Sequence, residues 1–391
     1  MSPPGALRLA PRFALLPLAL SAFACGGAAS SGAAPETAAA VAHPTIDVPA
    51  VVVSPYDDEA LRVMFSDAQK AFLAGDPRAA AEGFEKLLRL APNDAALVPP
   101  SLFNAGLARQ GTGEHVAADA HFLRLTSAFP EHAATRNARV RRLRSLAYLE
   151  RWADLVGAAD AVLALPDLAP LERIEAHGAR GLGLVEQDRV DEAARAVAVA
   201  QDLVETHRVG EAGTPPLEAA QASFALGEVR RRRSERLTFD PVPPNFTDVL
   251  EQRCQGLLDA QAAFSDAMRS LDPHWSAMAG YRVGTLYQQL HTDVMRIPVP
   301  AAADTVAKKQ LFEGAMRLRY RVLIEKGLKM MEATVRLGDR TGEASAWVAR
   351  ARDAKAELEH ALADEKAALA KLPYTEEELR AGLEALKKKT P

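Results

Sequence analysis

The chain has 391 residues, enough for roughly two or three ordinary domains or for one elongated array of repeats. Its net charge of −4 offers no overall attraction to nucleic acid or anionic lipid, and its two cysteines exclude a disulfide framework and a structural zinc site with the usual four ligands. Hydrophobic residues make up 48% of the chain and aromatic residues only 6%, which favours helices around a core of alanine, leucine and valine.

The first 24 residues have the composition of an export signal. They contain Arg8 and Arg12 but no acid, and these are followed by the apolar run FALLPLALSAFA at 13–24. A run of about 12 residues is too short to cross a bilayer, because a helix needs roughly 20 residues to do so. We therefore expect residues 1–24 to act as a signal peptide and to be removed.

The end of this segment resembles a bacterial lipobox. Small residues stand at Ala22 and Ala24, and Cys25 follows directly, so that its thiol would take diacylglycerol before cleavage in front of it. The resemblance implies a lipoprotein anchored by fatty acids such as palmitate. No aspartate follows Cys25 to retain the protein in the inner membrane, so the expected location is the periplasmic face of the outer membrane.

A second interpretation of these residues stays open. Ala22, Phe23 and Ala24 also fit the A-x-A site of the ordinary signal peptidase. Cys25 would then be a plain amino-terminal thiol of a soluble periplasmic protein, able to pair with Cys254. In either case residues 25–56 are rich in alanine, glycine, serine and proline, and we expect them to form a disordered tether.

An internal repeat begins after the tether. A shift of 38 residues superposes small, aromatic and chain-breaking positions: Phe65 on Phe103, Ala68 on Gly106, Gly75 on Gly113, Ala80 on Ala118, Phe84 on Phe122, Leu87 on Leu125 and Pro92 on Pro130. Each unit predicts a helix, a glycine turn, a second helix and a proline stop. This pattern resembles the tetratricopeptide repeat, although Met64 and Leu102 stand where that family has tryptophan and Arg109 where an aromatic residue is usual. Two weaker copies, at 143–165 and 177–204, complete an array that we assign to residues 57–209.

Longer helices are predicted after a glycine- and proline-rich link at 210–216. We expect them at 217–237, 247–271, 275–295, about 302–337 and 343–371, within a carboxy-terminal repeat-like region at 217–372. A capping-box spacing at Thr375 and Glu378 starts a cap helix within 373–391. The predicted fold class is therefore all-α: a helix–turn–helix solenoid of tetratricopeptide type, followed by longer helical hairpins.

No motif in the sequence predicts a catalytic or metal-binding site. The nine histidines include no H-E-x-x-H pattern, no G-x-S-x-G elbow occurs, and Cys254 fits a small core residue within a helix. The four arginines at 230–233 point around most of a helix, so we interpret them as a solvated face rather than a site for an acidic partner. We expect no enzyme activity, no cofactor and no metal.

The resemblance to tetratricopeptide repeats places the candidate binding surface on the first helix of each unit, which lines a concave groove in that family. Transferring the register gives five candidates, Arg62, Gln69, Phe72, Leu107 and Gln110. Phe65 and Phe103 are aromatic residues at helical spacing, and we interpret them as core between repeats.

The expected function is that of a non-enzymatic scaffold that binds envelope proteins or peptides, with membrane contact only through its lipid anchor and no nucleic acid. The order of aromatic residues and breaks at 240–362 is similar to tetratricopeptide proteins of bacterial envelope machines, including gliding-motility complexes. The alternative is a periplasmic receptor for a small solute or peptidoglycan fragment, with stacking faces supplied by Trp275, Tyr281, Tyr287 and Tyr320.

Overall fold

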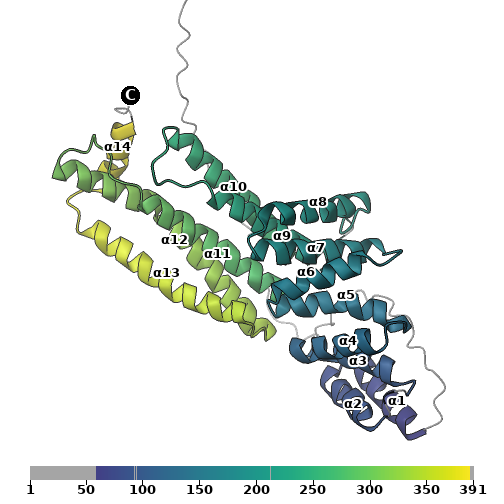
Figure 1. The fold of residues 1–391 in the computed structure, drawn as a ribbon. Coiled ribbons are helices and arrows are strands. Elements are labelled where there is room, and N and C mark those ends of the chain that lie inside the picture. The colour runs from purple at the N-terminus through teal and green to yellow at the C-terminus, as the bar shows by residue number, and fades with distance from the viewer. Residues whose placement is uncertain (1–58, 92, 94, 212, 388–391) are drawn as a thin grey trace, which may run out of the picture. The chain divides into compact units, whose positions relative to one another are not determined.

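The computed structural model describes residues 59–91, 93, 95–211 and 213–387, and these fall in one compact unit, Asp47–Pro391. The predicted signal peptide, Cys25 and the whole of the predicted tether at 25–56 lie outside the described residues. Across the described ranges every regular element is a helix (Figure 1), which confirms the predicted all-α fold class. The helices are α1 (Glu59–Leu73), α2 (Pro77–Leu90), α3 (Val98–Gly111), α4 (His115–Ala128), α5 (Ala133–Tyr148), α6 (Trp152–Leu163), α7 (Pro170–Glu186), α8 (Val190–Thr206), α9 (Leu217–Glu235), α10 (Phe246–Met268), α11 (Pro273–Met295), α12 (Val306–Thr341), α13 (Ala346–Ala370) and α14 (Glu376–Lys387).

Helices α1–α8 form hairpin pairs joined by tight turns at the expected places. The turns of the first two pairs contain Gly75 and Gly113, with φ of 79° and 76°. The next two turns place Glu150 and Asp188 in the same left-handed region, with φ of 55° and 62°. Glycine adopts this conformation without steric strain, but the later pairs keep the turn without it.

Small residues allow the two helices of a pair to approach closely. A Cβ atom on Gly83 would lie 2.8 Å from the Cβ of Ala68, and one on Gly106 would lie 2.4 Å from the ring of Phe122. The ring of Phe103 packs beside that of Phe122, with centroids 6.1 Å apart. Phe103 is only 4% exposed, so its interpretation as core is confirmed.

The division of the core does not follow the link at 210–216. One cluster of buried apolar residues runs from Leu61 to Ala138, and a second runs from Val140 to Val348. Both clusters therefore draw on α5, whereas α9 packs against α7 and α8 across the link. The longer helices α11, α12 and α13 lie side by side (Figure 1) and contact one another.

The carboxy-terminal cap helix has the predicted start. The backbone N–H of Thr375 donates to the Glu378 carboxylate at 2.8 Å, and the backbone N–H of Glu378 donates to Oγ1 of Thr375 at 3.2 Å. The helix packs on α12, where Leu379 is 2% exposed and a Cβ on Gly314 would meet the Leu379 side chain at 2.8 Å. The capping box is confirmed.

Substitution of Gly178 by alanine tests the close approach of α7 and α9. The new Cβ would lie 2.7 Å from the backbone nitrogen of Ala222, so the two helices must separate. We expect Gly178→Ala to lower the free energy of unfolding by about 2 kcal/mol, measured by urea denaturation. Gly157 is the matched control, because a Cβ atom at that position would have no neighbouring atom within 4 Å; there alanine should be neutral or stabilising by up to about 1 kcal/mol. Equal effects at the two positions would contradict this account of the packing.

Candidate functional site

The predicted groove residues of α1 share one side of that helix. Arg62, Gln69 and Phe72 stand at i, i+7 and i+10, which brings them to one face. Arg62 is exposed, Phe72 is 37% exposed and Gln69 is partly buried. An aromatic side chain that is open to solvent between polar groups is a surface suited to binding.

The two predicted groove residues of α3 are less accessible to a binding partner. Leu107 is partly buried against the amino-terminal core. The side-chain amide of Gln110 donates to the carbonyl oxygen of Arg141 at 2.9 Å and to Oγ of Ser145 at 2.8 Å, both on α5. Gln110 therefore holds neighbouring first helices together instead of facing a partner, and its assignment to an open groove is wrong.

The four aromatic residues predicted as a ligand pocket belong to the packed interior. Trp275 is fully buried, with its ring 5.6 Å from that of Tyr148, and Tyr287 is 5% exposed. Tyr281 and Tyr320 are partly buried against the same apolar cluster. A ligand cannot stack on the faces of Trp275, because helix packing already covers them, so the predicted pocket at this residue is wrong.

A buried ionic network joins three successive first helices. Arg144 of α5 donates to Glu175 of α7 at 2.9 Å and to Glu218 of α9 at 3.4 Å, and all three residues are buried. Burial lowers the pKa of Arg144, but the two carboxylates outweigh this effect and raise the pKa above its ordinary value. Burial raises the pKa of Glu175 by more than Arg144 lowers it. We call the side of α5, α7 and α9 that carries these residues the inner face.

Histidine and tyrosine rings join the inner face to α11. Tyr148 of α5 stacks on His274 of α11, with centroids 3.9 Å apart, and its hydroxyl donates to Asp272 at 3.1 Å. His115 meets the edge of Tyr148 at 4.4 Å. Burial and the neighbouring His274 lower the pKa of His115 from 6.5 to about 4. On its other side Nδ1 of His274 lies 3.2 Å from Oε1 of Glu343.

A second ionic cluster lies further along the inner face. Nε of Arg282, on α11, lies 2.7 Å from Oε1 of the fully buried Glu228, and another nitrogen lies 3.0 Å from Oε1 of Glu186. Burial raises the pKa of Glu228, but the surrounding arginines lower it overall. This cluster ties α11 to both α7 and α9.

The four arginines at 230–233 do not form the predicted solvated face. Arg231 is 13% exposed and binds Glu228 at 2.7 Å and Glu235 at 2.6 Å. Arg232 binds Asp188 at 2.9 Å. The prediction is wrong for Arg231 and Arg232, because acidic groups of α9 and of the turn before α8 bind them within the chain itself, whereas the side chain of Arg233 is 54% exposed.

The first turns of α13 also reach the array. Arg350 binds the Glu150 carboxylate with two nitrogens, at 2.9 and 3.0 Å. The ring of Trp347 lies under both Arg350, at 4.2 Å, and Arg282, at 5.0 Å. Together with the contacts of His274 and Arg282, these show that α11 and residues 343–350 cover the inner face of the middle of the array.

Two further properties concern only the described part of the chain. There, no group of three or more histidine, cysteine, aspartate or glutamate side chains is placed to hold one metal ion. No helix within the same ranges is long and apolar enough to span a membrane.

Comparisons with known proteins identify similar solved structures. No protein-family model matches the chain, and no curated protein matches it. The MamA RS-1 ArsTM double mutant is 18% identical, with a TM-score of 0.36, over 53% of this chain and 98% of that chain. A tetratricopeptide repeat protein from Parabacteroides merdae is 12% identical, with a TM-score of 0.39, over 75% of this chain and 99% of that one. A tetratricopeptide repeat protein from Bacteroides fragilis is 12% identical, with a TM-score of 0.27, over 77% and 98% of the two chains.

The fold is an all-α array of helix pairs, and this conclusion rests on the helices, turns and crossings of the chain itself. The repeat spacing, the left-handed turn residues and the small residues at the helix crossings define this class in the chain itself. The resemblance drawn from the sequence is confirmed at the level of fold.

The lowered pKa of His115 predicts a loss of stability in mild acid. The unfolded chain takes up a proton near pH 6.5 and the folded chain only near pH 4, so the free energy of unfolding falls as pH drops through this window. We expect His115→Gln to remove up to about 3 kcal/mol of the loss between about pH 7 and pH 4, measured by urea denaturation.

His360→Gln is the control for this measurement, because it replaces a histidine whose side chain is 77% exposed. The carboxylates of Glu85 and Glu343 titrate lower, with pKa values of about 2, and contribute below pH 4.5. A wild-type profile that is flat between pH 7 and pH 4 would contradict the assignment of His115.

Proposed function

We propose that this chain is a non-enzymatic scaffold that binds other proteins of the cell envelope. The observation that carries the proposal is the contrast between two surfaces of the array. The inner face of its middle helices is covered by the chain's own α11 and residues 343–350, whereas the face of α1 that carries Arg62 and Phe72 is exposed. An exposed aromatic side chain among polar groups provides an anchor for a protein partner.

The buried charges support a structural role rather than a catalytic one. Perturbed pKa values often mark active sites, but ion-pair networks that hold helices together perturb them as well. Arg144, Glu175 and Glu218 come from three helices and bind one another, and Arg282 bridges Glu186 and Glu228 in the same way. These charged groups are therefore paired with opposite charges on neighbouring helices.

The proposed location in the cell rests on the sequence. Residues 1–24 and Cys25 fit the signal and acylation site of a lipoprotein, so the scaffold would be anchored to the periplasmic face of the outer membrane. We further propose that it serves a multi-protein envelope assembly, such as one for motility, in keeping with the resemblance of residues 240–362 to proteins of such assemblies.

Charge reversal on α1 tests the binding face. We expect Arg62→Glu combined with Gln69→Ala to reduce capture of crosslinked envelope proteins at least about fivefold, because a like charge and a lost amide weaken a central contact by about 1 kcal/mol or more. Capture is measured by quantitative mass spectrometry after crosslinking in the native cell. Arg195→Glu on the exposed side of α8 is the matched control, and both variants should keep the wild-type melting temperature. Undiminished capture by the α1 variant would place the binding face elsewhere.

Replacement of Cys25 tests the anchor. We expect Cys25→Ser to abolish labelling by radioactive palmitate and to move the protein from the membrane fraction to the soluble periplasmic fraction. Cys254→Ser is the control, because Cys254 lies partly buried in α10 and should leave labelling and fractionation unchanged. Continued membrane association of Cys25→Ser would show that the lipid anchor is wrong.

A further inference from the structure

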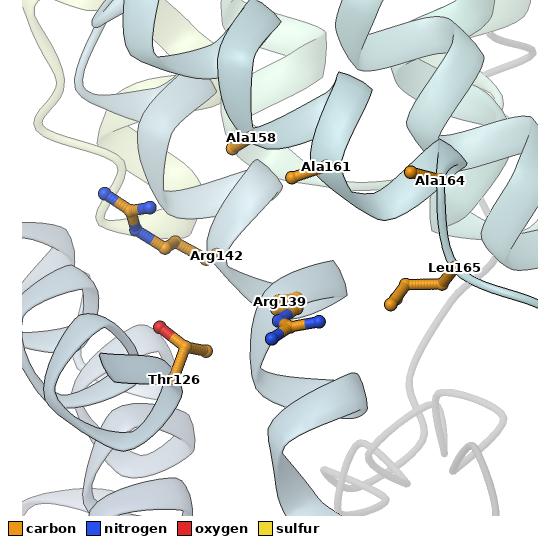
Figure 2. A pocket seen from close by; sticks show the side chains of 7 residues that line it. All are labelled: Thr126, Arg139, Arg142, Ala158, Ala161, Ala164 and Leu165. Carbon is orange, nitrogen blue, oxygen red and sulfur yellow. The ribbon is translucent and has the colours of Figure 1, made fainter. Parts of the chain in front are cut away.

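The side of α5 opposite the inner face carries a hollow. Arg139 and Arg141 are two positions apart, so they point about 200° apart around the helix. On the side of Arg139 a hollow of about 510 Å³ opens between α4, α5 and α6. It is lined by Thr126, Arg139, Arg142, Ala158, Ala161, Ala164 and Leu165 (Figure 2).

The hollow is open because three alanines line one of its walls. Ala158, Ala161 and Ala164 form one wall, in a row beside Leu165 (Figure 2), and each fills only the volume of a methyl group. A larger apolar side chain at these positions would reach across toward α5. The wall is therefore apolar, and the volume lies in the range that takes a small ligand or a few residues of a peptide.

The opposite wall carries two guanidinium groups, those of Arg139 and Arg142. Nε of Arg142 donates to Asp119 at 2.6 Å, but its two terminal nitrogens have no acceptor among the described residues. Arg151 donates to the second oxygen of Asp119 at 2.7 Å, so this carboxylate is already shared by two arginines. Within the described ranges Arg139 has no hydrogen bond or ion pair, and no acidic residue lines the hollow.

Several neighbouring arginines, unlike Arg139, have an acidic partner. Arg136 on the same helix binds Glu172 at 2.7 Å, Arg109 binds Glu85 at 2.6 Å, and Arg180 binds Asp160 at 2.6 Å. A partly buried guanidinium that faces an apolar wall without a counterion favours an anionic ligand, because a carboxylate accepts two parallel hydrogen bonds from its planar edge.

We propose that this hollow binds a peptide segment of a protein partner in which an acidic side chain stands next to small apolar residues. Arg139 and the terminal nitrogens of Arg142 bind the carboxylate, and the alanine wall with Leu165 contacts the neighbouring apolar residue. The inference rests on the proposed scaffold function and gives it a second contact surface, on the outer side of the array. A nucleic acid is disfavoured, because two arginines in one hollow do not follow a chain of phosphates and the net charge is −4.

Two blocked peptides test the charge requirement by isothermal titration calorimetry. One is acetyl-Ala-Leu-Glu-Ala-Ala-amide, and the other has glutamine in place of glutamate. We expect the glutamate peptide to bind the wild-type chain about tenfold more tightly than the glutamine peptide, as a charged hydrogen-bonded pair predicts. Arg139→Gln should weaken the glutamate peptide about tenfold, while Arg195→Gln, at an exposed position of α8, should bind as the wild type does.

Several outcomes would overturn the proposal. They are no binding of the glutamate peptide at millimolar concentration, equal binding of the two peptides, or full binding by Arg139→Gln with an unchanged melting temperature. Inorganic phosphate is the third probe, and if it binds Arg139-dependently while neither peptide does, the hollow takes a free anion and the peptide proposal is wrong. Arg139→Lys separates charge from geometry, since a lysine keeps the charge but loses the planar edge and should bind the glutamate peptide more weakly than the wild type.

Failure here can be told apart from failure of the scaffold function. If envelope proteins are captured by the wild-type chain and equally by Arg139→Gln, the scaffold stands and the hollow is not its contact. If the wild-type chain captures no defined protein, the scaffold function itself fails, whatever the peptides do.

Discussion

The close crossing of paired helices is the constraint on which the rest of the structure depends. Wherever two helices cross, a position with little or no side chain lets their backbones approach: Gly83 against Ala68, Gly178 against Ala222 and Gly280 against Thr334. With few aromatic residues in the chain, large side chains cannot fill wide gaps between helices. A core of alanine and leucine reaches normal packing density only when the helices lie close together, so the small crossing residues decide whether the array forms at all.

Close packing of small residues fixes the distance between two helices but not their alignment along the helix axes, because one alanine face resembles another after a shift of one turn. Ion pairs between the helices fix this alignment. Each of the first three boundaries between helix pairs carries a pair formed by an acid of a second helix and an arginine of the next first helix: Glu85 with Arg109, Asp119 with Arg142 and Asp160 with Arg180, each with a nitrogen–oxygen distance of 2.6 Å. Arg109 and His121 lower the pKa of Glu85 to about 2, which indicates a favourable contact. Partly buried pairs of this kind specify one alignment more than they add stability.

The features predictable from the sequence are those that repeat locally. The glycine turns, the paired phenylalanines and the capping box at Thr375 all lie within a window of one repeat, where periodicity exposes them. The inner-face network was not predictable, because Arg144 finds Glu175 and Glu218 31 and 74 positions away. Composition was also misleading. Trp275 suggested a ligand pocket, but in a chain with so few aromatic residues its large side chain fills the core.

The position of α5 bears on the two proposed binding surfaces, one at the edge of the array and one on its outer side. Both core clusters draw on this helix, and its inner face is held by Arg144 and Tyr148 against α7, α9 and α11. A partner entering there would have to displace α11 and separate Arg282 from the buried Glu228, and breaking a buried ion pair is strongly unfavourable. Few protein contacts provide enough free energy to offset this in addition to the cost of ordering the interface. A partner on α1, or on the side of α5 that carries Arg139, would displace no helix of the chain, so this cost would not be subtracted from its affinity.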